Sequence, residues 1–187
     1  PPRQDEDCLF LNVFAPHENG GDDAKKKKGG GGKAVLFFIH GGNFYQGYGG
    51  GVLYDGTSFV RNHDVVLVST NYRLGALGFL YSGAASEQAG HFTGNYALSL
   101  SLPLCLPCTD EQAGHFTGNY AIKDQQQAMR WVQDNIASFG GDPAKVTIFG
   151  QSAGGSSVAT HLNMPSSAGL FRYCLSLHAS RSLSLPP

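Results

Sequence analysis

The feature that most constrains the fold is a short apolar run that leads through a small residue into a helical pattern. Val146 to Phe149 has the composition of a buried strand, Gly150 follows directly, and the segment from about Ala153 to Leu162 has the pattern of a helix. A strand that turns into a helix so quickly needs small residues at the turn, because the backbone passes close to itself there. The arrangement predicts a strand–turn–helix unit of an α/β protein.

Three further apolar runs and one further helical pattern extend this unit. The expected strands are Cys8 to Phe14, Ala34 to Ile39 and Val65 to Ser69, and the last is continuously apolar, as in a sheet covered on both faces. Ala121 to Phe139 has the pattern of an amphipathic helix, which Gly140-Gly141 would end. Strands that alternate with helices favour a mostly parallel central sheet with flanking helices.

Composition excludes several functional classes. The chain has 187 residues, of which 41% are hydrophobic and 14% charged, and this suits one globular domain. A formal net charge of −1 gives no electrostatic case for binding nucleic acid, and no run approaches the roughly 20 apolar residues that span a bilayer. Cys105 and Cys108 have the spacing of a redox or metal pair, but no second ligand pair lies nearby, so we expect neither a metal nor a cofactor.

One part of the sequence follows no folding rule. Residues 87–97 read EQAGHFTGNYA, and residues 111–121 repeat them without a change. Two copies are too few for a repeat protein. Leucine and serine alternate between the copies and again near the chain end, which would suit an amphipathic strand. A CT-dinucleotide tract also translates into alternating leucine and serine, so we interpret residues 98–110 and 175–187 as translated non-coding sequence beside a duplicated exon edge.

Ser152 is the candidate nucleophile. It lies at the centre of Gly150-Gln151-Ser152-Ala153-Gly154, which fits G-x-S-x-G. A tight turn between strand and helix would project the serine hydroxyl above the sheet, and the N-terminal dipole of the helix would favour negative charge there. The short pattern alone is weak evidence, because glycine and serine are common, but its place between a strand and a helix strengthens it.

A second candidate element follows the expected strand Ala34 to Ile39. It reads His40-Gly41-Gly42-Asn43-Phe44, and a glycine-rich loop at a strand end can offer backbone N–H groups to an oxyanion. Together with the N–H of Ala153, these donors would stabilise the tetrahedral intermediate of an acyl transfer. The alternative is an ordinary glycine turn, which the presence of two matched elements in chain order disfavours.

Longer motifs follow one another along the chain. They are Glu6-Asp7-Cys8-Leu9-Phe10-Leu11-Asn12-Val13, Asn71-Tyr72-Arg73-Leu74-Gly75, Gly118-Asn119-Tyr120, Trp131-Val132-Gln133-Asp134-Asn135-Ile136 and Phe139-Gly140-Gly141-Asp142-Pro143. In this order they resemble the type-B carboxylesterases, the family that includes the cholinesterases, over about Asp5 to Phe171. The resemblance implies a partial α/β-hydrolase fold, truncated at both ends, with one domain over residues 1–187 in which 98–110 and 175–187 are non-family sequence.

Carried over by position, the resemblance implies that Ser152 is the nucleophile and that Gly42, Asn43 and Ala153 donate the N–H groups of the oxyanion hole. Position 43 is Asn where many members have Gly, and Asn tolerates unusual backbone angles better than most residues. Position 151 is Gln where the cholinesterase branch has Glu, and the region of the family's choline-binding tryptophan is not present. We therefore expect a small-molecule ester as substrate, but not a choline ester.

The resemblance also implies two structural features. One is a buried ion pair between Arg73 and Asp124, in which losing either partner would leave a costly unpaired charge. The other concerns Cys8, which resembles a cysteine that pairs with an earlier one in the family. That cysteine favours an oxidising compartment, the secretory pathway or the cell exterior, for the full-length parent, although the sequence itself leaves the localisation and any protein partner open.

The sequence offers no clear acid or base to complete a catalytic triad with Ser152. In the family, the acid and the histidine lie far downstream of the serine, whereas the 35 residues after Ser152 contain no Asp or Glu. His161 would lie on the helix that leads away from the serine, and His178 lies where the resemblance has ended. His40 is expected to pack and to form hydrogen bonds. We therefore expect the chain as written to lack both acid and base.

Three interpretations remain open. The first is a serine hydrolase of carboxylic esters that acts through an acyl-enzyme at Ser152. The second is a non-catalytic, cholinesterase-like binding domain, which the intact Ser152 disfavours because such members typically lose the nucleophile. The third is a non-functional translated fragment, which the duplication and the Leu-Ser tracts favour.

Overall fold

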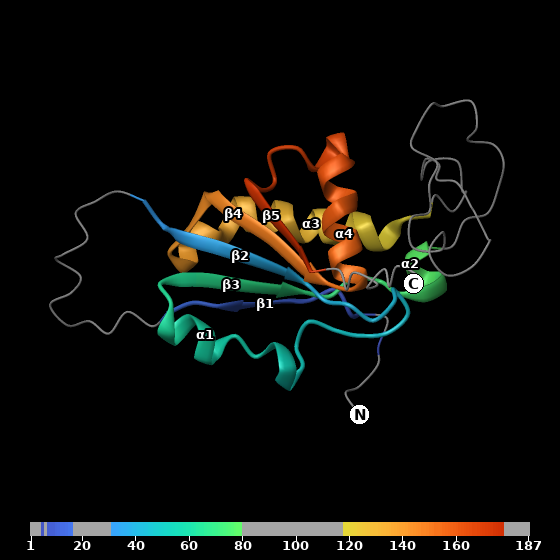
Figure 1. Ribbon diagram of the computed structural model, residues 1–187, viewed down its shortest axis with the longest axis horizontal. Coiled ribbons are helices and arrows are strands. Elements are labelled where there is room, and N and C mark those ends of the chain that lie inside the picture. Colours follow the sequence, from blue (N-terminus) through green and yellow to red (C-terminus); the bar gives the residue numbers. More distant parts are fainter. Residues whose placement is uncertain (1–4, 6, 17–30, 80–117, 178–187) are drawn as a thin grey trace, which may run out of the picture.

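A five-stranded sheet forms the centre of the part of the chain that the structure, a computed structural model, describes (Figure 1). The spatial order is β1 (Leu11–Phe14), β3 (Val65–Thr70), β2 (Lys33–Ile39), β4 (Gly141–Gln151) and β5 (Tyr173–Leu177). The pairs β2–β3, β2–β4 and β4–β5 are parallel, and β1 is antiparallel to β3. The sheet is therefore mostly parallel, as the sequence predicted.

The structure describes Asp5 and residues 7–16, 31–79 and 118–177. Several expectations from the sequence fall outside these residues: the first copy of the duplicated segment, the Leu-Ser tract at 98–110, the cysteine pair at 105 and 108, and most of the segment 175–187. Residues 175–177 are described, and they belong to strand β5.

The register of the central strands brings two loops together. Ile39 at the end of β2 pairs with Gly150 near the end of β4, and Phe38 pairs with Phe149. Because parallel strands end at the same edge of a sheet, the loop after β2 and the turn after β4 begin side by side. Both candidate elements of the site therefore lie at one edge of the sheet.

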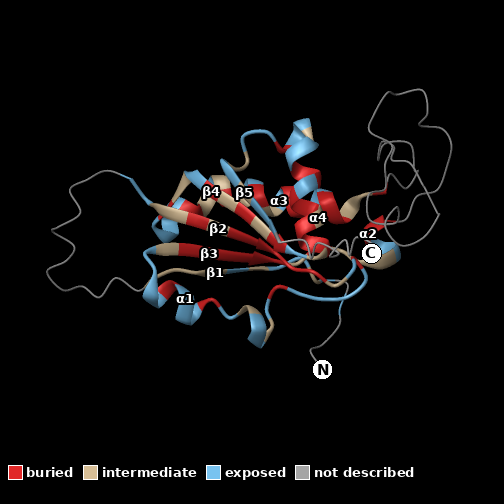
Figure 2. Cartoon of the chain, in the orientation of Figure 1, coloured by how far each residue is buried: buried red, intermediate tan, exposed pale blue. Residues whose placement is uncertain are grey.

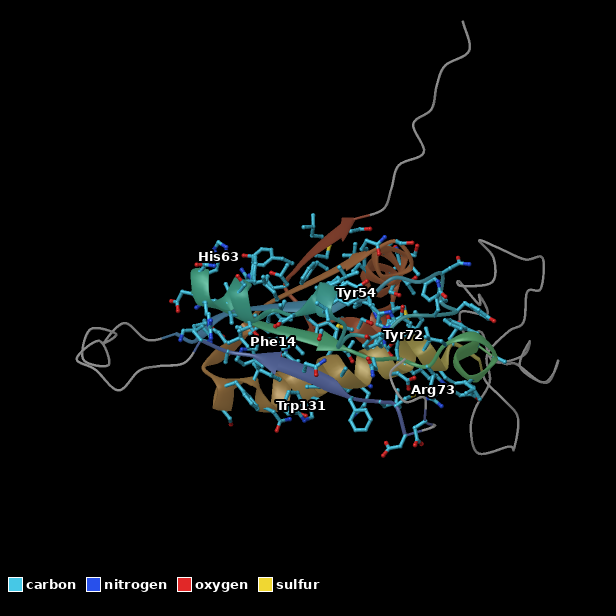
Figure 3. All side chains as sticks on the ribbon, turned by 90° about the horizontal axis from the view of Figure 1, so that it is seen from below. Phe14, Tyr54, His63, Tyr72, Arg73 and Trp131 are labelled. Carbon is cyan, nitrogen blue, oxygen red and sulfur yellow. The ribbon has the colours of Figure 1, made fainter. Side chains whose placement is uncertain are left out.

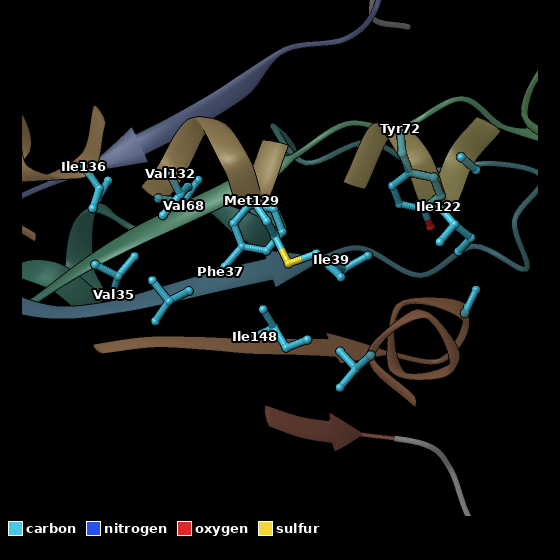
Figure 4. Close-up of a cluster of buried hydrophobic side chains, with 14 of the residues drawn as sticks. Val35, Phe37, Ile39, Val68, Tyr72, Ile122, Met129, Val132, Ile136 and Ile148 are labelled. Carbon is cyan, nitrogen blue, oxygen red and sulfur yellow. The ribbon is translucent and has the colours of Figure 1, made fainter. Parts of the chain in front are cut away.

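Two helices cover one face of the sheet, where they enclose the main hydrophobic core (Figure 4). They are α3 (Tyr120–Asn135) and α4 (Ala153–Asn163). Alternate residues of the strands point toward them, since side chains of a strand alternate between the two faces. The fully buried members of this core include Val35, Phe37, Ile39, Val68, Met129, Val132, Ile136, Val146, Ile148 and Val158.

The opposite face carries much less cover. Helix α1 (Thr57–Asn62) and the short 3-10 helix η2 (Val52–Tyr54) lie along it, and Figure 2 shows both as mostly exposed. Between them and the sheet is an open apolar groove of about 430 Å³, whose lining includes Phe38, Tyr54 and Phe149. Phe38 contacts both other rings, at centroid distances of 4.9 and 5.1 Å.

The observed elements match the predicted ones in kind, with shifted boundaries. The strand expected from Cys8 begins at Leu11, and the strand expected from Val146 begins at Gly141. Helix α3 ends at Asn135 and continues as a 3-10 turn over Ile136–Phe139. The sequence pattern predicts neither α1 nor β5, nor the short helix α2 (Gly75–Phe79).

Candidate active site

Ser152 occupies a sharp turn between β4 and α4. Its φ is 56° and its ψ is −118°, an unusual conformation for a residue with a side chain. Helix α4 begins at the next residue, Ala153, whose N–H is among the first N–H groups of the helix and so has no intrahelical acceptor. The partly exposed serine therefore stands beside a free helix N-terminus, with its backbone held in a costly conformation.

Two glycines make this turn sterically possible. A Cβ at Gly150 would lie 2.9 Å from the Cα of Gly154, and a Cβ at Gly154 would overlap the carbonyl oxygen of Ile39. Each position approaches backbone atoms that cannot move aside as a flexible side chain would. The first turn of α4 can therefore pack directly against the ends of β4 and β2.

The glycine-rich loop after β2 lies against this turn. A Cβ added to Gly41 would be 2.6 Å from the carbonyl oxygen of Gln151 and 3.2 Å from the Cβ of Ser152. The next three residues, Gly42, Asn43 and Phe44, have φ values of 116°, 57° and 58°. The structure thus brings this loop beside the serine, with three successive residues in the left-handed region.

Backbone and ring contacts hold the strained loop. The carbonyl of Gly42 accepts hydrogen bonds from the N–H groups of Tyr45 and Gln46, each at 3.0 Å. The carbonyl of Phe44 accepts one from the N–H of Gly75 at 2.8 Å, and the buried Phe44 ring packs edge-on against Phe79 at 5.4 Å. These contacts offset the cost of the backbone conformation at the positions that were expected to bind the oxyanion.

Two side chains fix the far end of the loop, and neither was expected from the sequence to contribute to the site. Asn71 accepts a hydrogen bond from the N–H of Gly49 at 2.7 Å, and Ser69 donates one to the carbonyl of Gly49 at 2.7 Å. Asn71 also donates to the carbonyl of Cys8 at 2.9 Å. The first residue of the Asn71–Gly75 motif thus ties the N-terminal segment to this loop, and only that motif signalled it in the sequence.

His40 is enclosed at the start of the loop. It is 1% exposed, its ring stacks on Tyr72 at a centroid distance of 4.3 Å, and its Nδ1 lies 2.7 Å from the carbonyl oxygen of Gly41. A carbonyl can only accept, so Nδ1 carries the proton and donates it. Burial lowers the pKa of His40, which keeps the ring neutral.

Arg73 and Asp124 form an ion pair between the segment after β3 and helix α3. Arg73 Nε donates to one carboxylate oxygen of Asp124 at 2.8 Å, its Nη2 donates to the other at 2.7 Å, and its backbone N–H adds a third bond at 3.0 Å. The guanidinium lies 4.9 Å from the ring centroid of Tyr120, and Figure 3 shows Arg73 beside α3. Asp124 is the more deeply buried partner: 7% of its side chain is exposed, against 37% of the Arg73 side chain.

His161 lies on the buried side of α4 and faces away from Ser152. Its Nε2 is 2.9 Å from Gln125 Oε1, and its Nδ1 is 3.0 Å from Ser167 Oγ. Gln125 donates to Ser157 Oγ at 3.1 Å, so its oxygen faces His161, and the ring carries its proton on Nε2. Burial lowers the pKa of His161 to about 4. The residue is thus an uncharged structural link between α3 and α4.

No described histidine serves Ser152. His40 and His161 are buried and bonded elsewhere, and His63 precedes the start of β3, at the opposite edge of the sheet. Within the described ranges, no three His, Cys, Asp or Glu side chains gather as a metal site would require, and no helix is long and apolar enough to cross a membrane. Cys8 and Cys174 carry free thiols. The site therefore combines a strained serine with a glycine-rich loop, and its base is not among the described residues.

Comparison with known proteins places this arrangement in a family. The profile of the carboxylesterase family matches residues 1–99 and 108–182. The chain belongs to the carboxylesterase family. It is 39% identical over 171 residues to the para-nitrobenzyl esterase of Bacillus subtilis and 41% identical over 179 residues to cholinesterase 1 of Branchiostoma lanceolatum. These alignments cover 91% and 96% of the chain, but only 27% and 39% of the two relatives.

Solved structures of carboxylesterases share the fold. A PNB esterase superposes with a TM-score of 0.68 at 37% identity, over 94% of this chain and 30% of its own. The carboxylesterase EST55 of Geobacillus stearothermophilus gives a TM-score of 0.65 at 40% identity, over 90% of this chain and 28% of its own. The described structure thus corresponds to a part of the α/β-hydrolase fold of this family.

Proposed function

We propose that the carboxylesterase containing this chain hydrolyses small-molecule carboxylic esters through an acyl-enzyme at Ser152. The observation that carries the proposal is the strained Ser152 turn, with φ 56° and ψ −118°, packed against Gly41 of the glycine-rich loop. A backbone outlier of this kind is kept where the surrounding structure holds it for a purpose. The family supports ester hydrolysis as the reaction class.

The proposed chemistry has two halves. In the first, Ser152 Oγ attacks the ester carbonyl carbon while a base takes its proton, the carbonyl oxygen becomes an oxyanion, and the alcohol leaves with a proton. In the second, water attacks the acyl-enzyme and releases the acid. Gly42, Asn43 and Ala153 donate N–H groups to the oxyanion, each worth about 3 kcal/mol in the transition state of comparable enzymes. His40 and His161 are unsuited as the base, because both are buried and hydrogen-bonded elsewhere.

The substrate proposed is an uncharged ester. Gln151, which is exposed beside Ser152, contributes no charge to the entrance of the site. The groups expected to touch the oxyanion are backbone N–H groups, which recognise the ester carbonyl without selecting its alcohol.

The test compares two serine variants of the full-length protein with a small activated ester such as p-nitrophenyl acetate. Ser152→Ala should lower kcat/KM by at least about 10³-fold. Ser58→Ala is the matched control, because Ser58 is exposed on helix α1, away from the serine turn, and its activity should stay within about threefold. Mass spectrometry should find the acyl group on the peptide that contains Ser152. Undiminished hydrolysis by Ser152→Ala would overturn the proposal.

A further inference from the structure

The orientation of the expected oxyanion donors can be traced through the carbonyl groups that precede them. In a trans peptide the C=O and the following N–H point in opposite directions. The Gly42 carbonyl is held by two N–H groups, from Tyr45 and Gln46, so the N–H of Asn43 is directed to the other side of that peptide. The Gly41 carbonyl likewise determines where the N–H of Gly42 points.

The Gly41 carbonyl is held by a side chain. His40 Nδ1 lies 2.7 Å from this oxygen, and the ring is fixed by its stack on Tyr72. Tyr72 in turn donates its hydroxyl proton to the carbonyl of His40 at 2.7 Å, and burial raises the pKa of Tyr72, so that it remains a donor. At Gly47 a Cβ would lie only 2.6 Å from His40 Nδ1, so the loop closes directly over the ring.

The second nitrogen of the His40 ring argues against packing as the only role of this side chain. His40 Nε2 is buried and has no hydrogen-bond partner among the described residues. A buried acceptor without a partner costs about 1–3 kcal/mol, whereas an apolar ring of similar shape would stack on Tyr72 without that cost. A histidine at this position is therefore less favourable for packing than an apolar ring. What the histidine offers, and an apolar ring would lack, is the Nδ1–H group.

We propose that His40 is a positioning residue of the oxyanion hole: its Nδ1–H, bound to the Gly41 carbonyl, orients the N–H of Gly42 toward the oxyanion. The inference rests on the proposed function of Ser152. His40 itself does not touch the substrate. It acts through the peptide between Gly41 and Gly42, and the stack on Tyr72 fixes the orientation of its ring.

The experiment uses the 187-residue chain and phenylboronic acid as a tetrahedral probe. The Ser152 hydroxyl adds to trigonal boron, a B–O bond forms, the hydroxyl proton passes to the buffer, and the boron becomes a tetrahedral anion in the place of the oxyanion. Binding is an equilibrium, so it needs no catalytic base. Affinity is measured by calorimetry, and the tetrahedral adduct by ¹¹B NMR.

Four variants separate the possible outcomes. His40→Phe keeps a ring against Tyr72 without the donor and should weaken binding by about tenfold. His40→Asn places an amide N–H near the former Nδ1 and should restore affinity to within about threefold. His63→Phe, the same exchange at an exposed histidine, should bind like the wild type. Ser152→Ala should form no adduct.

Each result has one meaning. If His40→Phe and the wild type bind phenylboronic acid equally and Ser152→Ala forms no adduct, the role of His40 is refuted and the proposed function stands. No adduct with the wild type, or an unchanged one with Ser152→Ala, would refute both. If His40→Phe does not fold, ¹⁵N NMR of the wild-type imidazole decides: protonated Nδ1 and unprotonated Nε2 are expected, and the opposite tautomer removes the bond on which the proposal depends.

Discussion

At the scale of single residues, Gly154 shows how little freedom the serine turn has. Its Cα faces the backbone carbonyls of Ile39 and His40, and a Cβ there would overlap the first of them. The obstacle is backbone of the central strand, which cannot rotate away. The geometry of Ser152 therefore depends on a residue two positions further along, which has no part in the proposed chemistry.

Gly154→Ala should lower the free energy of unfolding by about 2 kcal/mol or more, because the first turn of α4 would have to move off β2. Gly50→Ala is the control, since a Cβ there meets only ordinary contacts of 3.6 to 3.9 Å, and its effect should stay within about 0.5 kcal/mol. Urea denaturation followed by circular dichroism measures both. Equal stability of the two variants would contradict the steric argument.

Arg73→Ala should destabilise the chain by about 2 kcal/mol, because Asp124 would remain buried without its three hydrogen bonds. The value is below that of a fully buried pair, since the guanidinium is partly exposed to solvent, which screens it. Lys145→Ala removes one partner of the more exposed Lys145–Asp142 pair and should leave the denaturation midpoint unchanged. A similar shift in both variants would show that the Arg73 pair has no special weight.

At the scale of elements, the contact between α3 and α4 is polar at its centre. Gln125 links Ser157 to His161, and Ser167 closes the other side of the ring. All four side chains are buried. The packing of the helix that carries the serine turn thus depends on a neutral histidine.

This contact predicts a pH dependence of stability. The pKa of His161 falls from 6.5 to about 4 on folding, so the unfolded state binds a proton first as the pH falls. The contribution of neutral His161 to the free energy of unfolding is fully present above about pH 6.5. It is lost as the pH falls toward 4, by up to about 3 kcal/mol. His161→Gln should flatten this slope, and His63→Gln, at an exposed position, should not. Chemical denaturation at several pH values measures it, and a slope unaffected by His161→Gln would reject the assignment.

The long elements were predictable from the sequence, and the short ones were not. Periodicity was sufficient for α3 and α4, and apolar runs were sufficient for β2 and β3. Strand β5 was obscured because its leucine and serine resemble the adjoining tract, and its pairing with β4 is a tertiary contact. Helix α1 has six residues and no side-chain cap, so it left no signal in the sequence.

The residues of the site also fall into those that could be predicted from the sequence and those that could not. The serine turn and the glycine loop are local patterns, so their residues could be named from the sequence. His40–Tyr72 and His161–Gln125 join positions 32 and 36 residues apart, and no local pattern encodes such a contact. Arg73 and Asp124 could be named only through the family resemblance, because their side chains meet across 51 positions.

At the scale of the whole molecule, the isolated chain should not turn over esters. None of the described histidines is available to Ser152, and a serine hydroxyl is a weak nucleophile without a base. Hydrolysis of p-nitrophenyl acetate by the purified 187-residue chain should equal that of its Ser152→Ala variant. Robust hydrolysis that depends on Ser152 would show that the missing base lies within the chain after all.

The order of the sheet has a consequence for synthesis on the ribosome. Strand β2 lies at the centre, with β3 on one side and β4 on the other, and β4 is encoded about 100 residues after β2 ends. At roughly 5–20 residues per second, one edge of β2 waits about 5–20 s for its partner. During that interval its Val-Leu-Phe-Phe-Ile run has one unpaired edge, and an unpaired apolar strand edge is where a folding intermediate is prone to aggregate.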